Sequence, residues 1–278
     1  MAAQPDSRIN TNERITGIPG LEIIKLSGIL QQKDEAEVLD LACGGGIITT
    51  KILKAASEDP ELKIDRILAG DMDDHMLSFV TRKRDATGPD SQWSLVKAQK
   101  MNQNSIPQPD NTFTHVFNNF GVFFEPNETA TLAETHRVLK HGGFAGFTSW
   151  KSIAWWGEVA DPALAKYLPQ APKLPAPGGL FPTSGWSDVK ATPEKLKTAG
   201  FRDVQATEFS FAPRVEAEAF ADATAFLVQS IASRVWSREL YERLQGDIEP
   251  ALLRYLRENY KDGVWDGKMT AIITMGFE

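Results

Sequence analysis

The chain has 278 residues, of which 24% are charged and 42% hydrophobic, and its formal net charge is −7. This length suits one large domain, or one domain with a sizeable cap, and it allows a real core. The negative charge and the absence of a Lys/Arg-rich face argue against nucleic-acid binding. Cys43 is the sole cysteine. A disulfide within the chain and a cysteine-built metal site are therefore excluded, and we expect no metal.

The sequence contains no apolar run of about 18 residues, and its polar start does not resemble a signal peptide. We therefore expect a cytoplasmic protein that makes no contact with a membrane. The expected partner is a small-molecule substrate, and the expected oligomeric state is a monomer or a weak dimer.

The first part of the chain alternates between strands and helices. Residues 10–30 predict a helical N-terminal cover, interrupted at Gly17, Pro19 and Gly20. Predicted strands then span 36–42, 64–71, 93–98, 113–119 and 144–150. Predicted helices span 47–57, 73–84 and 128–140. Gly142 and Gly143 are expected to cap the last of these helices at its C-terminus.

After residue 150 the pattern changes. Residues 151–191 are rich in Pro, Gly and Trp and predict a cap segment with little regular structure. The remaining segments predict, in order, a short helix at 193–199, a strand at 204–211, helices over 216–260 and a strand at 269–275. Strands that alternate with helices predict an α/β, Rossmann-like fold with a mainly parallel, seven-stranded sheet. We interpret residues 1–278 as one domain with cap insertions at about 151–191 and 213–265.

The chain is organised around a glycine-rich turn at residues 37–50, E-V-L-D-L-A-C-G-G-G-I-I-T-T. An apolar strand ends in Asp40, and three glycines then lead into a helix. Gly44 and Gly46 can adopt positive φ and carry no Cβ, so a ligand can lie against bare backbone there. This order is typical of a nucleotide-like site at the carboxyl end of a parallel strand.

Three kinds of ligand turn compete for this segment. A Walker loop is excluded because no lysine follows Gly46 at the required place. A dinucleotide fingerprint is disfavoured because Thr49 stands where its third glycine would be. The third kind is the S-adenosylmethionine turn, an acid followed by x-G-x-G-x-G, with Ala42 here in the place of the first glycine.

Four motifs in order resemble the class I S-adenosylmethionine-dependent methyltransferases that act on small molecules, over about residues 36–150. Besides the turn, these are Gly70-Asp71-Met72, the IPQPDNTF segment at 106–113, which is similar to "LPFPDNSFD", and the HRVLKHGGF segment at 136–144, which is similar to "RVLKPGG". The resemblance implies a single methyltransferase domain whose sheet has an antiparallel last strand. It also implies S-adenosylmethionine as cofactor and S-adenosylhomocysteine as product.

The resemblance assigns the methionine end of the cofactor to the glycine-rich turn. The backbone around Ala42, Gly44 and Gly46 would meet the methionine part, and Asp40 would lie near its ammonium group. Asn118, at the end of the fourth strand, resembles the residue whose backbone lies beside the sulfonium.

For the nucleoside end, Asp71 resembles the acid that accepts both ribose hydroxyls, which is a bidentate task suited to a carboxylate. Met72 would stack on adenine through its polarisable side chain. The family often has an acid after the third strand, where we place Lys97, and a lysine cannot accept a hydrogen bond. We therefore expect the adenine contact from Ala98 and Gln99.

Aromatic residues are the candidates for substrate contact. The fourth strand is followed by Phe120, Val122, Phe123 and Phe124, and an aromatic face against a sulfonium methyl has a cation–π rationale. Of these we take Phe123 as the candidate substrate contact. Trp150, Trp155 and Trp156 open the first cap segment. Clustered tryptophans suggest a flat, apolar substrate, and the alternative is that these rings only pack the core.

The sequence assigns no catalytic base. His75, His115, His136 and His141 all fall at positions that suit a structural role. A phenol would need a base, whereas a thiol is already about 3% thiolate at pH 7. The pattern therefore favours a nucleophile that needs little help, either a thiol or a neutral amine.

The layout further resembles fungal natural-product methyltransferases, including the bis-thiomethyltransferases of gliotoxin-type dithiols. The shared features are Thr-His-Val-Phe in the fourth strand, Ser149-Trp150, Gly185-Trp186, residues 200–204 and a closing Ala-Ile-Ile-Thr-Met-Gly. The resemblance implies methylation of a small, apolar secondary metabolite, with sulfur as the first acceptor. Nitrogen or oxygen is the alternative acceptor, and a further alternative is a fold repurposed for a reaction without methylation.

Overall fold

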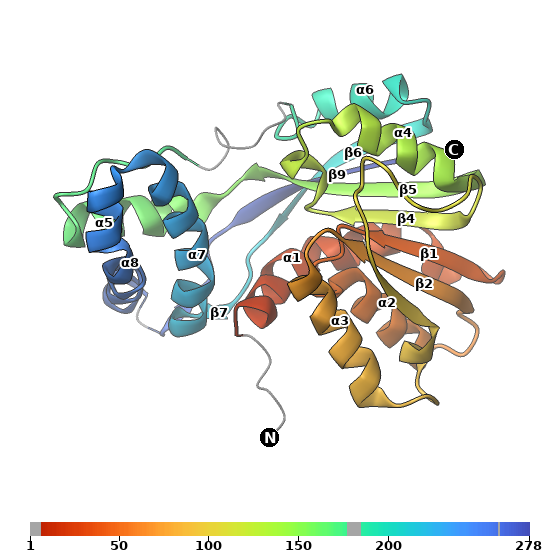
Figure 1. The fold of residues 1–278 in the computed structure, drawn as a ribbon, viewed down its shortest axis with the longest axis horizontal. Helices are drawn as coiled ribbons and strands as arrows, with labels where there is room; N and C mark the ends of the chain where they lie inside the picture. The colour runs from red at the N-terminus through yellow and green to blue at the C-terminus, as the bar shows by residue number, and fades with distance from the viewer. Residues whose placement is uncertain (1–6, 177–184, 261) are drawn as a thin grey trace. The chain divides into compact units, whose positions relative to one another are not determined.

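The computed structural model describes residues 7–176, 185–260 and 262–278 (Figure 1). The chain divides into two compact units. The sheet unit comprises Pro19–Lys151, Pro182–Phe209 and Ala271–Glu278, and the helical unit comprises Met1–Ile18, Ser152–Phe181 and Ser210–Thr270. The predicted cap insertions begin and end near the boundaries of the helical unit. That these segments cap a site stays a prediction.

Seven strands of the described chain form one sheet in the order β3-β2-β1-β4-β5-β9-β6. Strand β1 pairs in parallel with both β2 and β4, and β4 pairs in parallel with β5. Strand β9 is antiparallel to β5, because Gly142 and Gly143 near the start of β5 exchange backbone hydrogen bonds with Glu278 just after β9. The predicted α/β class and sheet are thereby confirmed. The strands are β1 (Ala36–Leu41), β2 (Ile64–Asp71), β3 (Val96–Lys100), β4 (Phe113–Asn119), β5 (Leu139–Ser152), β6 (Arg202–Phe211) and β9 (Met269–Phe277).

Helices cover both faces of this sheet. Figure 1 shows α2 and α3 on one side and α4 and α6 on the other. On the first side, Val38, Ile67 and Phe117 of the strands share a buried cluster with Ile48 and Ile52 of α2. The helical elements are α1 (Ser7–Leu26), η1 (Ile29–Gln31), α2 (Ile47–Glu58), α3 (Asp74–Thr87), η2 (Gln92–Leu95), η3 (Val122–Phe124), α4 (Glu128–Val138) and α6 (Ala191–Thr198).

The chain order reverses at β1, with β2 and β3 on one side of it and β4 and β5 on the other. In open α/β sheets, ligands bind at such a switch point, outside the carboxyl ends of the strands. The ends of β1, β2 and β4 therefore define where the site lies.

The predicted interruption of the N-terminal helix is wrong. Helix α1 runs without a break through Gly17, Pro19 and Gly20. Its last turns carry Ile23 and Ile24, which are both fully buried in the core of the sheet unit. Burial of these two side chains outweighs the weak helix propensity of the preceding glycines and proline, because tertiary packing supplies most helical stability in proteins.

The predicted glycine cap after α4 is also wrong. The helix ends at Val138, and the chain enters β5 directly at Leu139. Gly142 and Gly143 therefore lie inside β5, where Gly142 has a φ of 74°. The register of β5 against β4 shifts in the same region. The two glycines thus lie where the strand is irregular.

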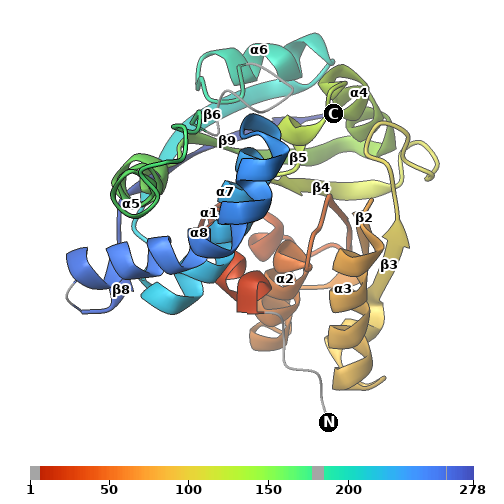
Figure 2. The same cartoon turned by 60° about the vertical axis from the view of Figure 1, so that its left-hand side comes forward.

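The helical unit is more regular than the sequence predicts. Residues 151–191 contain a π-helical turn, η4, and helix α5, while 177–184 lie outside the described residues. Pro162 occupies the first turn of α5, where proline is tolerated, so it does not break the helix. The predicted helices over 216–260 are confirmed, and Figure 2 shows α7 beside α8. The elements are η4 (Trp156–Ala160), α5 (Asp161–Tyr167), β7 (Val215–Glu216), α7 (Ala217–Val235), α8 (Arg238–Asn259) and β8 (Val264–Trp265).

Candidate cofactor site

The turn after β1 presents bare backbone to open space. Ala42, Gly44 and Gly46 have φ angles of 56°, 52° and 80°. The amide of Gly46 donates to the carbonyl of Cys43 at 2.9 Å, which closes the turn at the start of α2. An ideal Cβ built on Gly44 would meet no atom within 4 Å. A ligand can therefore approach the backbone here, as the sequence predicts.

Asp40 lies beneath this turn and does not line the cavity described below. Its side chain is buried, and Oδ2 accepts hydrogen bonds from the amide (3.0 Å) and the hydroxyl (2.7 Å) of Thr49 in α2. Burial raises the pKa of Asp40 to about 7. Its position ties β1 to α2. It does not support the predicted contact with the ammonium group of the cofactor.

Asp71 joins the turns that follow β1 and β2. Its Oδ2 accepts from the amide of Gly44 at 2.8 Å, and its Oδ1 accepts from the amide of Asp73 at 2.9 Å. A carboxylate has about four acceptor sites, so both oxygens can still accept from a ligand. The next residue, Met72, has an exposed fraction of 53%. Contact of both residues with a nucleoside stays a prediction.

A cavity of about 330 Å³ opens at the carboxyl ends of the strands. Four residues that the sequence predicts to bind the cofactor lie in its wall: Ala42, Gly44, Asp71 and Met72. Phe120 and Phe124, which belong to the aromatic run noted after the fourth strand, line it too. The sequence-based prediction missed the other lining residues, which are Met101, Gln103, Asn119, Gly121 and Glu125.

The predicted adenine contacts are displaced along the chain. Residues 92–95 form a 3₁₀ turn, and β3 starts later than predicted, at Val96. Ala98 and Gln99 consequently lie inside the strand and do not line the cavity. Met101 and Gln103, just beyond the strand, line the cavity, and contact of Ala98 and Gln99 with adenine stays a prediction. In the segment V-K-A-Q-K, apolar and polar residues alternate too weakly to indicate where the strand begins and ends.

Asn118 positions the wall and does not line it. It is fully buried, its Oδ1 accepts from the amide of Gly121 at 3.0 Å, and its Nδ2 donates to Oε1 of Gln103 at 2.8 Å. Its neighbour Asn119 faces the cavity. The polar side chain at the end of β4 thus links the loops after β3 and β4.

Ala42 and Gly121 press against each other from the loops after β1 and β4. Gly121 has φ −101° and ψ −37°, a conformation open to any residue. Its ideal Cβ, however, would lie 2.5 Å from Cβ of Ala42 and 2.9 Å from Oδ1 of Asn118. A side chain at position 121 would clash with both residues, so glycine is required there, in part because the turn carries Ala42.

We expect Gly121→Ala to lower the free energy of unfolding by about 1–3 kcal/mol, the usual cost of overpacking. Urea unfolding measures this change. Adding Ala42→Gly removes the nearer of the two blocking atoms, so the double variant should recover part of the loss. Gly157→Ala is the control, because no atom lies within 4 Å of its ideal Cβ. If Gly121→Ala and Gly157→Ala had equal unfolding midpoints, the proposed clash between position 121 and Ala42 would be contradicted.

Aromatic rings form the outer wall. Phe120 stacks on Trp150 with ring centroids 4.1 Å apart, and Phe124 has an exposed fraction of 56%. Phe123, the predicted substrate contact, is buried against both Phe120 and Phe124. Trp150 supports Phe120 and is itself half-buried. Phe120 and Phe124 therefore line the cavity in place of the predicted residue.

Trp155 and Trp156 belong to the helical unit and are buried there, with exposed fractions of 5% and 3%. Their ring centroids lie 5.7 Å apart, and Trp155 meets Phe220 edge to face. Both rings serve the packing of this unit. Contact with a substrate stays a prediction for them.

None of the described residues that line the cavity is a histidine. His115 is buried in β4, and burial lowers its pKa to about 4. The remaining three contact other residues of the sheet unit: His75 packs on Phe79, His136 on Phe201, and His141 pairs with Glu278. Their positions agree with the structural roles predicted for them.

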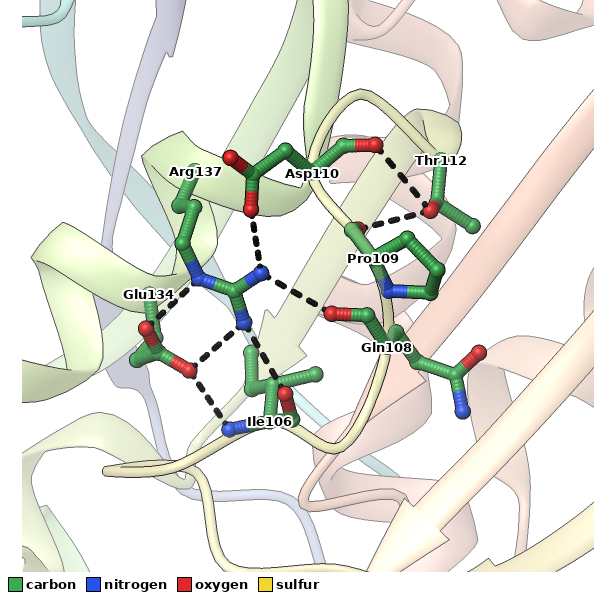
Figure 3. Close-up of polar contacts among 7 residues, drawn as sticks. All are labelled: Ile106, Gln108, Pro109, Asp110, Thr112, Glu134 and Arg137. Carbon is green, nitrogen blue, oxygen red and sulfur yellow. Dashed lines mark hydrogen bonds and ion pairs between the residues drawn. The ribbon is translucent and has the colours of Figure 1, made fainter.

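Arg137 of α4 holds the loop between β3 and β4 (Figure 3). Its guanidinium donates to the carbonyls of Ile106 and Gln108, both at 2.9 Å, and to the carboxylate of Asp110 at 2.7 Å. Glu134 accepts from the same guanidinium at 2.8 Å and from the amide of Ile106 at 2.7 Å. The two motifs at 106–113 and 136–144 thus form one structural unit behind the cavity wall.

Comparison with known proteins supplies the family. Residues 38–143 match the methyltransferase domain family. The chain is 29% identical over 253 residues to methyltransferase tpcH of Aspergillus fumigatus, covering 86% of this chain and 83% of that protein. It is 26% identical over 259 residues to acetylaranotin bis-thiomethyltransferase of Aspergillus terreus, covering 89% and 84%. The solved structure of the cyclase SpnF shares the fold, with a TM-score of 0.54 and 18% identity over 92% of this chain and 80% of that chain.

The sheet has a Rossmann-like topology, and residues 38–143 match the model of the methyltransferase domain family. The protein is an S-adenosylmethionine-dependent methyltransferase related to fungal methyltransferases. Its cofactor is S-adenosylmethionine.

The cavity suits that cofactor chemically. Asp71 offers acceptors for ribose hydroxyls, and Met72 and Phe124 offer exposed apolar surface for a flat base. The open face at Gly44 leaves room for the methionine chain. Two carboxylates and no cationic side chain occur among the described lining residues, which suits a ligand that carries a sulfonium.

Proposed function

We propose that this methyltransferase methylates a small, largely apolar natural product, with a thiol sulfur as the acceptor. The observation that carries the proposal is the composition of the cavity wall, which has aromatic rings and no histidine among its described residues. An acceptor that needs no strong base fits such a wall. The bis-thiomethyltransferase among the relatives supports the same acceptor.

The bound cofactor supplies an electrophilic methyl group. A thiolate of the substrate would take this methyl group, with a new carbon–sulfur bond in place of the bond to the sulfonium, and S-adenosylhomocysteine would be the other product. The thiol proton passes to water, because about 3% of an ordinary thiol is already ionised at pH 7. The chain's own contribution is then to orient the reactants, which can supply roughly 7–11 kcal/mol of the barrier reduction.

We also propose that the protein acts in the cytoplasm on a small molecule, without nucleic acid or membrane, as a monomer or weak dimer. No helix within 7–176, 185–260 or 262–278 is long and apolar enough to cross a membrane. The net charge of −7 supports a partner other than nucleic acid.

A panel of dithiols, monothiols, amines and phenols tests the acceptor. The purified protein and S-adenosylmethionine are incubated with each compound, and mass spectrometry follows both S-adenosylhomocysteine and a mass gain of one CH₂ in the compound. We expect the highest kcat/KM with thiols. Faster methylation of amines or phenols would replace sulfur by nitrogen or oxygen as the acceptor.

A second candidate function is a reaction without methylation, because the cyclase SpnF shares the fold. Cofactor binding with no S-adenosylhomocysteine released across the whole panel would favour this candidate. Release of the product together with a methylated compound would exclude it.

A further inference from the structure

Glu125 is a carboxylate in the cavity wall to which none of the motifs assigns a role. It follows η3 in the loop after β4, and its side chain is partly buried. Its Oε2 accepts from Nδ2 of Asn104 at 2.8 Å. Asn104 in turn accepts at Oδ1 from the hydroxyl of Thr131, at 2.6 Å, and Thr131 is fully buried in α4. The carboxylate is therefore held in place by a chain of oriented polar groups.

The charged side chains among the described residues of the cavity wall are all acidic. Asp71 and Glu125 are its acidic residues, and no Lys or Arg occurs among the described residues that line it. Two nearby cations are engaged elsewhere, since Lys83 donates to the carbonyl of Gly45 and Lys100 pairs with Asp74. Asp71 already serves two backbone amides of the turns. Glu125 accepts a hydrogen bond from the neutral amide of Asn104, which does not neutralise its charge, so the carboxylate can still attract a cationic ligand.

The two ligands that must share this cavity differ by one charge. S-adenosylmethionine carries a sulfonium, an ammonium and a carboxylate and is a net cation, whereas S-adenosylhomocysteine has lost the sulfonium charge and is neutral overall. A fixed negative charge near the sulfur stabilises the sulfonium of the cofactor, whereas the product carries no charge at that atom. A hydrogen bond to ribose or adenine, by contrast, contributes equally to both ligands.

We propose that Glu125 makes the site selective for the charged cofactor over the product of methyl transfer. The carboxylate acts as a specificity-determining residue that favours exchange of product for fresh cofactor. This role does not depend on which acceptor atom the enzyme methylates.

The test is the ratio of two dissociation constants, measured by calorimetry without substrate. Glu125→Gln keeps the shape and the oxygen that accepts from Asn104 but removes the charge. We expect it to raise Kd for S-adenosylmethionine about three- to tenfold, as for a partly screened ion pair, and Kd for S-adenosylhomocysteine less than about twofold. The preference of the wild type for the charged ligand should also shrink in high salt.

Two matched variants make the result decisive. Asp71→Asn removes both a charge of the wall and the predicted ribose acceptor, so it is expected to raise both dissociation constants and to change their ratio less than Glu125→Gln does. Glu125→Asp retains the charge and should keep the Kd ratio close to that of the wild type. Thermal melts confirm that each variant is folded. The proposal is overturned if Glu125→Gln weakens both ligands equally, which would indicate a contact to the nucleoside, or if it changes neither constant.

Discussion

Replacing Arg137 by alanine is expected to lower the free energy of unfolding by about 2–4 kcal/mol. The reason is that removing one partner of a hydrogen-bonded ion pair leaves the remaining polar groups without its hydrogen bonds and charge. The guanidinium is partly buried, with 32% of the side chain exposed. Its removal takes the guanidinium donor from the carbonyl of Gln108, leaves the carbonyl of Ile106 with only the amide of Gln108, and leaves Glu134 without its counter-ion. Chemical denaturation at neutral pH measures the change.

The same substitution should weaken cofactor binding, because the anchored loop begins directly after residues that line the cavity. Arg137→Lys separates charge from geometry: a single ammonium cannot reproduce the planar fork that reaches two carbonyls and two carboxylates. We expect the lysine variant to retain less than half of the stabilisation. The exposed surface pair of Arg257 and Glu218 is the control, and Arg257→Ala should lower the free energy of unfolding much less than Arg137→Ala does. A loss at Arg137 no larger than at Arg257 would contradict this account.

The sequence predicted the central strands well because each is a short apolar run that ends at a distinct polar signal. The bounds of β2 and β4 are those predicted, and β1 differs by one residue. Asp71 and Gly44 could be placed in the same way, since the ends of adjacent parallel strands must lie together.

The remaining cavity residues depend on contacts between distant parts of the chain. Gln103 lines the wall because Asn118, fifteen positions away, holds its amide. Gly121 is small because Ala42 fills the space beside it. Neither relation leaves a local pattern in the sequence. The glycine-rich turn did carry a visible signal, its missing first glycine, and the structure shows Gly121 as the position that accommodates the change.

The cavity wall does not include two of the residues that the sequence predicts to contact a ligand. Phe123 and Asp40 each occupy positions that motif spacing assigns to ligand contact, but both side chains are buried away from the cavity. Their neighbours Phe124 and Ala42 line it instead. A residue in or just after a strand can point into the site or into the core, and spacing alone does not distinguish the two.

Asp40→Asn is expected to stabilise the cofactor-free protein above pH 7. The pKa of Asp40 is 3.8 in its ordinary state and about 7 in the fold, because burial penalises the charge. The folded state therefore holds a proton that the unfolded chain has released between pH 4 and pH 7, and stability falls as pH rises across that range. At about 1.4 kcal/mol per pH unit between the two pKa values, the charge costs the folded state about 4 kcal/mol above pH 7.

Asparagine keeps an oxygen that can accept both hydrogen bonds from Thr49 and carries no charge. The gain of the variant over the wild type should thus be about 2–4 kcal/mol at pH 8 and should shrink toward zero near pH 4. Urea unfolding at a series of pH values gives the difference directly, and pH effects common to both proteins cancel. Asp247→Asn, on the exposed side of α8, should show no comparable trend. A gain for Asp40→Asn that is constant with pH would show that the carboxyl is not protonated in the folded state at neutral pH.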